Sequence, residues 1–156
     1  PKRVAIYSHF ENVFRPEGIA AGHTVIVRLA DGWFWIIPID EAHTSVGLVT
    51  TVESMRRGRG TPEEIFNRAV ESSSKLTELM RGSRATMEFH VTSDYSYFRQ
   101  QLATERMVMI GDAGGFFDPI FSSGVYVGMN SARDAVRVIA RAHREQRSLT
   151  LAERTG

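Results

Sequence analysis

Four runs of β-branched, aromatic and other apolar residues near the start of the chain constrain its fold more than any other feature. Such residues favour β-strands, and the links between the runs are polar. One link contains Asp31-Gly32, a pair typical of a two-residue hairpin. The sequence therefore predicts an antiparallel meander with the strands Lys2–Phe10, His23–Ala30, Trp33–Ile39 and His43–Thr50.

The composition is that of an ordinary globular chain. Its 156 residues suffice for one sizeable core, and 42% hydrophobic with 24% charged residues argues against a disordered or membrane-spanning chain. The absence of cysteine excludes disulfides and favours a reducing, cytoplasmic location. With 19 basic and 18 acidic residues, no excess charge favours nucleic acid. The start, Pro1–Phe10, has neither an initiator Met nor a signal peptide, so we expect a segment of a longer protein.

A helix with a well-marked start follows the four runs. Thr61 is an N-cap residue, Pro62 suits the first helical position, and Glu64 completes a capping box. Apolar residues at helical spacing extend the predicted helix over residues 61–81. Alternating residues in Ala85–Val91 predict one further strand.

The last part of the chain has a strand–loop–helix pattern. Arg106–Ile110 is a continuous apolar run, typical of a strand buried on both faces, and it ends at Gly111-Asp112. A loop rich in Gly, Phe and Ser leads to a helix that begins near Ser123-Gly124 and carries a row of exposed arginines. We predict an α+β fold, with an antiparallel sheet and one helix in residues 1–104 and the strand, loop and helix in residues 105–156.

The densest aromatic segment is Gly32–Pro38. Because side chains alternate along a strand, Trp33 and Trp35 share one face and Pro38 lies on the other. Two indoles on one face form a flat wall, and each has an N–H donor that needs a partner. Pro38 favours an edge or a bulge, since proline donates no ladder hydrogen bond. The segment is consistent with an aromatic core strand or with a wall that faces a ligand.

The loop after the apolar run has groups suited to binding. The free N–H groups at a helix start attract anionic or electron-rich groups. Asp112 would accept hydrogen bonds from sugar or polyol hydroxyls. Ser122 or Ser123 is suited to the N-cap, and Gly124 lets a flat ligand approach the backbone. The five histidines have no metal-ligand spacing, and neither a G-x-S-x-G nor a P-loop sequence is present.

The two segments together resemble the signatures of flavin-dependent halogenases. A W-x-W-x-I-P sequence and a later F-x-x-P-x-x-S-x-G sequence are similar to the two signatures of that family. The matching residues are Trp33, Trp35, Ile37 and Pro38, followed by Phe116, Pro119, Ser122 and Gly124. Gly111-Asp112 also resembles the second flavin-binding motif of p-hydroxybenzoate-hydroxylase-like flavoproteins. The resemblance extends over nearly the whole chain and implies an FAD-dependent oxidoreductase of the halogenase-like branch.

The resemblance implies roles for both segments. Asp112 would bond the ribityl chain of FAD, the helix start would face the isoalloxazine ring, and the loop would also hold halide. The indole strand would separate flavin from substrate, so that a small oxidant such as hypohalous acid travels between them. The implied cofactor-binding residues are Gly111, Asp112, Pro119, Ser123, Gly124 and Val125; the halide residues are Ser123 and Gly124; the wall is Trp33, Trp35 and Pro38.

The chain departs from the family pattern in two respects. It has no G-x-G-x-x-G for the ADP half of FAD. The nearest match, Gly58-Arg59-Gly60, has Glu63 at the position of the third glycine. Neither Lys2 nor Lys75 matches the catalytic lysine of the family, so we assign no catalytic residue. We therefore expect the 156-residue chain alone to be colourless and inactive.

The resemblance also implies partners for the whole enzyme. These are a small electron-rich organic substrate and a separate flavin reductase, with neither nucleic acid nor a membrane span. The apolar side of the last helix is expected to associate with another domain or chain. Three alternatives remain open: an FAD-dependent monooxygenase, a prenyl reductase like geranylgeranyl reductase, and a substrate-binding fragment that is inert alone.

Overall fold

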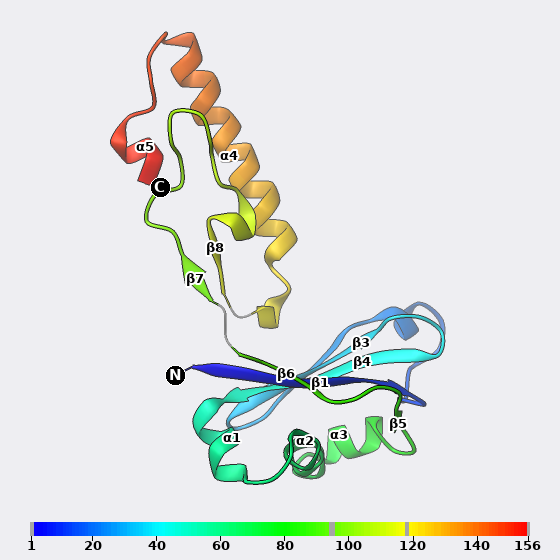
Figure 1. Ribbon diagram of the computed structural model, residues 1–156. Coiled ribbons are helices and arrows are strands. Elements are labelled where there is room, and N and C mark those ends of the chain that lie inside the picture. The colour runs from blue at the N-terminus through cyan, green and yellow to red at the C-terminus, as the bar shows by residue number, and fades with distance from the viewer. Residues whose placement is uncertain (1, 94–95, 118, 156) are drawn as a thin grey trace. The chain divides into compact units, whose positions relative to one another are not determined.

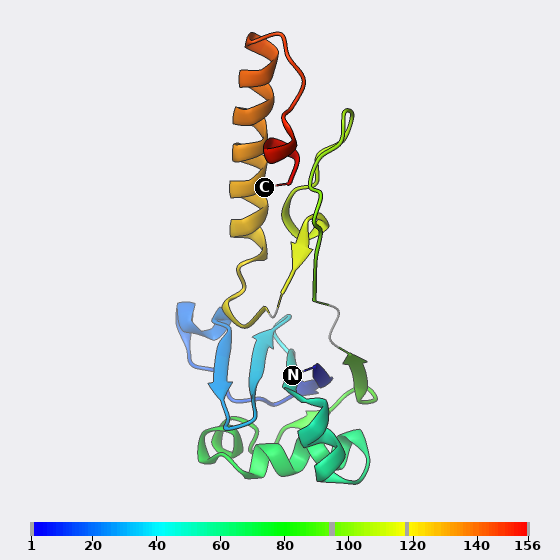
Figure 2. The same ribbon diagram turned by 90° about the vertical axis from the view of Figure 1, so that its left-hand side faces the viewer.

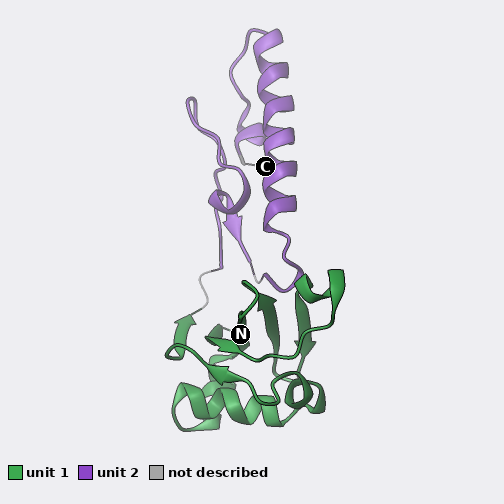
Figure 3. Ribbon diagram, turned by 90° about the vertical axis from the view of Figure 1, so that its right-hand side faces the viewer, with its two compact units in different colours: residues 1–94 green, residues 95–156 purple. Residues whose placement is uncertain are grey.

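The computed structural model describes residues 2–93, 96–117 and 119–155 (Figure 1). The chain divides into two compact units, Pro1–Asp94 and Tyr95–Gly156 (Figure 3). The first unit contains a sheet with three helices, and the second contains a long helix beside irregular segments. The domain boundary inferred after residue 104 concerns the whole enzyme and stays a prediction.

The sheet of the first unit confirms the α+β class. Its pairs are all antiparallel, in the order β2-β3-β4-β1-β5, and β6 also pairs with β1. The predicted meander is confirmed for β2, β3 and β4 but is wrong for β1, which pairs with β4 instead of β2. The link from β1 to β2 holds a 3-10 turn, Gly18–Gly22, and is no tight hairpin. The strands are β1 (Arg3–Glu11), β2 (Val25–Arg28), β3 (Gly32–Pro38), β4 (His43–Thr51), β5 (Arg84–Ala85) and β6 (His90–Ser93).

The two faces of this sheet differ. Figures 1 and 2 show the helices gathered on one face. Along β1 every second residue is buried, and Phe10 from this strand and Phe34 from β3 contact Phe66 of a covering helix, with ring centroids 5.6 and 5.1 Å apart. Burial of each such side chain contributes roughly 1.5–3 kcal/mol. The opposite face has no covering helix within this unit, and it carries the two tryptophans.

The helix predicted over residues 61–81 is two helices, α2 (Pro62–Glu71) and α3 (Ser74–Leu79). The hydroxyl of Ser72 donates to the carbonyl of Ala69, and Ser73 caps α3. Serine side chains compete in this way for backbone hydrogen bonds, so the three consecutive serines end one helix and start the next. A further helix, α1 (Val52–Gly58), precedes them.

The capping box at the start of α2 is confirmed. The amide of Glu64 donates to the hydroxyl of Thr61, and the amide of Thr61 donates to the Glu64 carboxylate. Replacing Thr61 by Ala is expected to lower the free energy of unfolding by about 1 kcal/mol, because one helix-start amide loses its acceptor. Urea unfolding measures this loss. Thr24→Ala, at an exposed position outside the helices and strands, is the control and should change stability by less than about 0.5 kcal/mol.

The strand predicted for Ala85–Val91 is interrupted. Phe10 pairs with Ala85, whereas Tyr7 pairs with His90, so the register along β1 shifts by two residues. The buried hydroxyl of Ser8 donates to the carbonyl of Met87 at 2.8 Å and stabilises the extra loop. The partner of β1 is therefore two short strands joined by a bulge with two extra residues.

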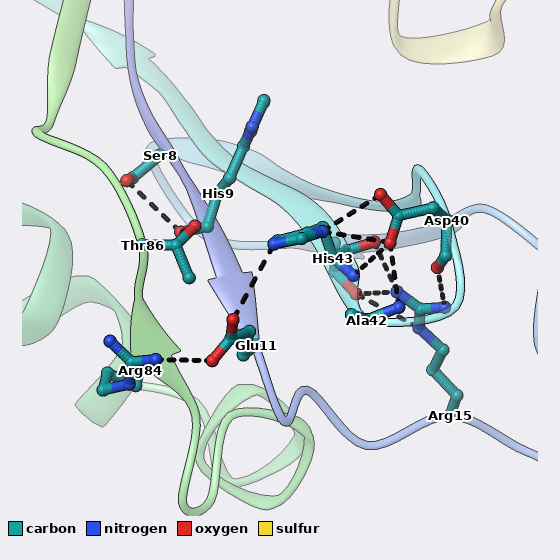
Figure 4. Close-up of polar contacts among 10 residues, drawn as sticks. Ser8, His9, Glu11, Arg15, Asp40, Ala42, His43, Arg84 and Thr86 are labelled. Atoms are coloured by element: carbon teal, nitrogen blue, oxygen red, sulfur yellow. Dashed lines mark hydrogen bonds and ion pairs between the residues drawn. The ribbon is translucent and has the colours of Figure 1, made fainter.

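A polar network secures the turn between β3 and β4 (Figure 4). Arg15 donates to the carbonyl of His43 and to the hydroxyl of Thr44, while His43 lies 3.0 Å from the Asp40 carboxylate. A hydrogen bond from the His43 amide is the largest cause that lowers the pKa of Asp40, to about 2; bonds from the His43 ring and the Ala42 amide add to it. The turn that ends the tryptophan strand is thus held by charge-assisted bonds.

The second unit has short elements around one long helix. The strand predicted for Arg106–Ile110 is wrong, because Val108 makes only an isolated bridge to Ala103 and is 38% exposed. A strand buried on both faces needs neighbours on both sides, and the described residues of this unit offer only that bridge. The elements are β7 (Tyr97–Phe98), a 3-10 turn (Gly111–Ala113), β8 (Gly115–Phe116), a second 3-10 turn (Pro119–Phe121), α4 (Gly124–Arg144) and α5 (Leu151–Thr155).

The predicted solvent-exposed arginine row on α4 is confirmed. The Arg137 side chain is 70% exposed and that of Arg141 is 53% exposed, and they pair with Asp134 and Glu153 respectively. In the described residues, no helix combines the length and apolarity needed to cross a bilayer.

Candidate functional site

The two tryptophans lie together on the face of the sheet opposite the helices of the first unit. The ring centroids of Trp33 and Trp35 are 6.0 Å apart, and Phe34 between them points to the core on the other side. The alternation inferred from the sequence is therefore confirmed. Trp33 is buried, and its indole N–H has no hydrogen-bond partner in the described residues. A buried donor without a partner is uncommon in proteins, and the described residues leave this indole N–H unsatisfied.

The aromatic row continues from Trp35 across the sheet. The ring of Tyr7 on β1 lies 5.9 Å from that of Trp35, and the ring of His90 on β6 lies 5.6 Å from that of Tyr7. The indole N–H of Trp35 donates to the hydroxyl of Ser45 at 3.0 Å. We name Trp33, Trp35, Tyr7 and His90 the aromatic row. Its tryptophans were predictable from the W-x-W spacing, whereas Tyr7 and His90 were not, because their place depends on the register between β1 and its partners.

Pro38 lies apart from the indoles. It is on the helix-covered face, where it borders a cavity of about 140 Å³ with Phe14 and Leu79. It also lies beyond the last pair between β3 and β2, Val25 with Ile36, so its missing N–H breaks no bond to β2. At position 38 the strand therefore has a paired neighbour on one side only, β4, although β3 as a whole pairs with both β2 and β4. Proline tolerates such an edge position.

The Gly-Asp loop of the second unit packs tightly on α4. Gly111 has φ +55°, and a Cβ placed on it would lie 3.1 Å from the Cα of Gly128. Its amide donates to the hydroxyl of Ser131 at 2.8 Å. The Tyr97 hydroxyl donates to the carbonyl of Asp112 at 2.5 Å. Gly128 and Ser131 are not among the residues predicted for this site, although a glycine inside a predicted helix is itself a packing signal.

Asp112 and Gly124 are brought together by this packing. A Cβ on Gly124 would lie 3.9 Å from a carboxylate oxygen of Asp112. The Asp112 carboxylate is exposed and has no hydrogen bond or ion pair to any residue that the structure describes. An acceptor without a partner therefore stands beside the positive end of a 21-residue helix.

The start of α4 has no side-chain cap from its N-cap residue. Ser123 is at the N-cap, but its side chain makes no capping hydrogen bond, and Val125 is 75% exposed. Ser122 has φ +50°, and its amide donates to the carbonyl of Pro119 at 2.8 Å, which closes the turn before the helix. The predicted cofactor and halide residues of this unit thus form one cluster, with the loop residue 118 outside the described part of the chain.

The polar network of Figure 4 is structural. Each of its carboxylates has a cation or imidazole beside it, since Glu11 pairs with Arg84 and Asp40 with His43. Within the described ranges, no group of three or more His, Asp or Glu side chains has the geometry to hold a metal ion.

Comparison with known proteins identifies the family. Residues 5–155 match the tryptophan halogenase family. A 1H-pyrrole-2-carbonyl-[peptidyl-carrier protein] chlorinase from Pseudomonas fluorescens is 38% identical over 137 residues, which are 84% of this chain and 30% of that protein. The chain therefore spans less than a third of the length of this relative.

Two solved structures share the fold. The myxobacterial chondrochloren halogenase CndH, described as an FAD-dependent halogenase, has a TM-score of 0.72 and 31% identity, covering 90% of this chain and 32% of its own. A flavoprotein/dehydrogenase from Cytophaga hutchinsonii has a TM-score of 0.74 and 25% identity, covering 96% of this chain and 36% of its own. With the family match over nearly its whole length, the chain belongs to the tryptophan halogenase family.

Proposed function

We propose that the whole protein is an FAD-dependent halogenase that acts on an electron-rich aromatic or alkene substrate. The observation that carries the proposal is the joint presence, in a chain of this family, of an indole pair on the sheet face opposite the helices and of an Asp112 carboxylate, with no partner among the described residues, beside a glycine helix start.

The residues of the second unit fit the central part of FAD. The carboxylate of Asp112 has no partner among the described residues and would accept hydrogen bonds from ribityl hydroxyls. The amides of Gly124 and Val125 would face the electron-rich pyrimidine edge, and Ser123 with Gly124 would hold halide. Gly111 and Pro119 would shape the loop, with the close contact at Gly128 keeping the backbone of the loop in place.

The proposed reaction has two steps, and each is balanced in atoms and electrons. Reduced FAD, when bound, supplies two electrons to O₂, and with halide and one proton this yields hypohalous acid, water and oxidised FAD. The hypohalous acid then replaces a substrate hydrogen by halogen and releases water. In this chain the indoles of Trp33 and Trp35 would keep the organic substrate away from the flavin. We assign no catalytic residue among the described residues.

The partners follow from this chemistry. We propose a separate flavin reductase that regenerates reduced FAD from NADH, and a cytoplasmic location, which the absence of cysteine supports. The chlorinase relative is named for a pyrrole carried on a protein, so a substrate of that chemical type is one candidate. The apolar side of α4, exposed at Val125, Met129 and Val136, is proposed to associate with another domain or chain.

The test is a reaction of the intact protein with FAD, NADH, reductase, O₂ and halide. We expect a chlorinated or brominated product by mass spectrometry. A second candidate is a non-halogenating flavoprotein, a monooxygenase or prenyl reductase, which the likeness to the Cytophaga flavoprotein/dehydrogenase favours. A product that is unaffected by halide and has gained hydrogen across a double bond would establish the reductase and overturn the halogenase.

Replacing Trp35 by Ala in the intact protein is expected to raise the escape of hypohalous acid into solution about tenfold, which corresponds to about 1.4 kcal/mol of barrier. The reason is the loss of half of the indole wall. A scavenger in solution, assayed against halogenated product, measures the escape. Ile37→Ala, on the same strand and face but 40% exposed, is the matched control. An equal loss of FAD affinity in Trp35→Ala would mean that the strand is merely part of the core.

A further inference from the structure

Gly47 lies directly beneath the indole of Trp35. It is in the middle of β4, where its neighbours across the sheet are Trp35 on β3 and Tyr7 on β1. A Cβ on Gly47 would lie 2.2 Å from Cζ2, 2.4 Å from Cη2 and 2.5 Å from Cε2 of the indole. These distances are far below van der Waals contact, so the six-membered ring of Trp35 occupies the space that any other side chain at position 47 would need.

The backbone gives no other reason for this glycine. Gly47 is not among the residues with positive φ, so its conformation is open to any amino acid. A glycine inside a strand costs roughly 0.5–1 kcal/mol of stability relative to alanine. All three close atoms belong to the Trp35 side chain. The missing side chain at position 47 therefore serves the placement of that indole.

Three other groups hold the same ring. The hydroxyl of Ser45 accepts from the indole N–H at 3.0 Å, and the rings of Tyr7 and Trp33 lie 5.9 and 6.0 Å from that of Trp35. Gly47 bounds the indole from below, Ser45 fixes its polar atom, and the two aromatic rings bound it at the sides. The indole is thus held flat against the sheet by four residues from three strands.

We propose that Gly47 is a positioning residue for the oxidant wall, by which we mean the indoles of Trp33 and Trp35. Gly47 provides the recess in which Trp35 lies flat, and Ser45 and Tyr7 retain the indole there. This inference rests on the proposed function of the wall. A methyl group at position 47 would displace the indole by roughly 1 Å, since carbon atoms need about 3.5 Å of separation. That displacement would lengthen the bond to Ser45 and open the row between Trp35 and Tyr7.

The test compares Gly47→Ala with Ser45→Ala and with the control Gly22→Ala, a glycine of the same unit with no atom within 4 Å of its Cβ position. The readouts on the intact protein are near-ultraviolet circular dichroism, the FAD dissociation constant and escaped hypohalous acid. We expect Gly47→Ala to change the tryptophan signal and to raise escape severalfold towards that of Trp35→Ala. The FAD dissociation constant should change less than about twofold, and Gly22→Ala should match the unaltered protein.

A rescue variant separates positioning from general damage to the strand. Trp35→Phe removes the part of the ring that lies over Gly47. The double variant Gly47→Ala with Trp35→Phe should therefore unfold at a higher urea concentration than Gly47→Ala alone. Absence of rescue, or an unchanged tryptophan signal in Gly47→Ala, would overturn the inference. If Gly47→Ala does not fold, rescue of folding by Trp35→Phe supports the inference, and failure of that rescue overturns it.

The function proposed for the wall and the positioning role proposed for Gly47 can be refuted separately. If Trp35→Ala releases no additional oxidant, the function proposed for the wall is wrong, and the inference about an oxidant wall falls with it. If Trp35→Ala releases oxidant while Gly47→Ala and Ser45→Ala do not, the wall stands and Gly47 is not its positioning residue.

Discussion

Replacing Phe66 by Ala is expected to lower the free energy of unfolding of the first unit by about 3–5 kcal/mol. Phe66 is fully buried between α2 and the sheet, with its ring centroid 5.1 Å from those of Phe34 and Phe89 and 5.6 Å from that of Phe10. Truncation would remove contacts to all three rings and leave a cavity. Because total stabilities are only about 5–15 kcal/mol, this loss is a large share of what the unit has.

Tryptophan emission measures this loss directly. Both tryptophans of the chain, Trp33 and Trp35, belong to the first unit, so a urea titration followed by their emission reports on this unit alone. Ile19→Ala, at a side chain that is 92% exposed, is the control and should change stability by less than about 0.5 kcal/mol. A loss below about 1 kcal/mol for Phe66→Ala would contradict the arrangement of the core.

Replacing Asp112 by Ala in the intact protein is expected to weaken FAD binding by about 10- to 150-fold. A hydrogen bond to a charged group contributes about 1.5–3 kcal/mol, and 1.4 kcal/mol is tenfold in affinity. The carboxylate of Asp112 makes no bond to a residue that the structure describes, so we expect the loss to appear in binding and not in folding. Titration of FAD fluorescence measures the dissociation constant.

Asp134→Ala is the matched control for this variant. Asp134 is an exposed carboxylate on α4 in the same unit, but it pairs with Arg133 and Arg137. Its removal should leave FAD affinity within about twofold. Equal FAD affinity in Asp112→Ala and the unaltered protein would remove Asp112 from the proposed cofactor site.

Features governed by neighbouring residues were predictable from sequence. The capping box of Thr61 and Glu64 and the alternation that puts Trp33 and Trp35 on one face both depend on local spacing, and both are confirmed. The hairpin predicted between β2 and β3 is also present, with the amide of Leu29 donating to the carbonyl of Gly32, but its two turn residues are Ala30 and Asp31 and Gly32 already belongs to β3. Local chemistry is enough for such features, because each is closed within a few residues.

Features that depend on distant segments were not predictable from the sequence. The place of β1 beside β4 is decided by pairing over their full length, and no local pattern encodes which strand is the neighbour. Gly47 escaped notice for the same reason: only the register between β3 and β4 puts it under Trp35. The apolar run at Arg106–Ile110 has the composition of a buried strand, but composition alone provides no partner strands.

The two-residue bulge beside β1 has a consequence for self-association. A long, regular outer strand is a template on which a second molecule can add its own strand and begin to aggregate. Here the outer strands are short, with four residues in β2, two in β5 and four in β6, and the shift in register separates β5 from β6. An incoming chain would therefore find no more than a few consecutive unpaired amides and carbonyls along either edge of the sheet. The edges are poor templates for strand addition, even though no helix of this unit covers one face of the sheet.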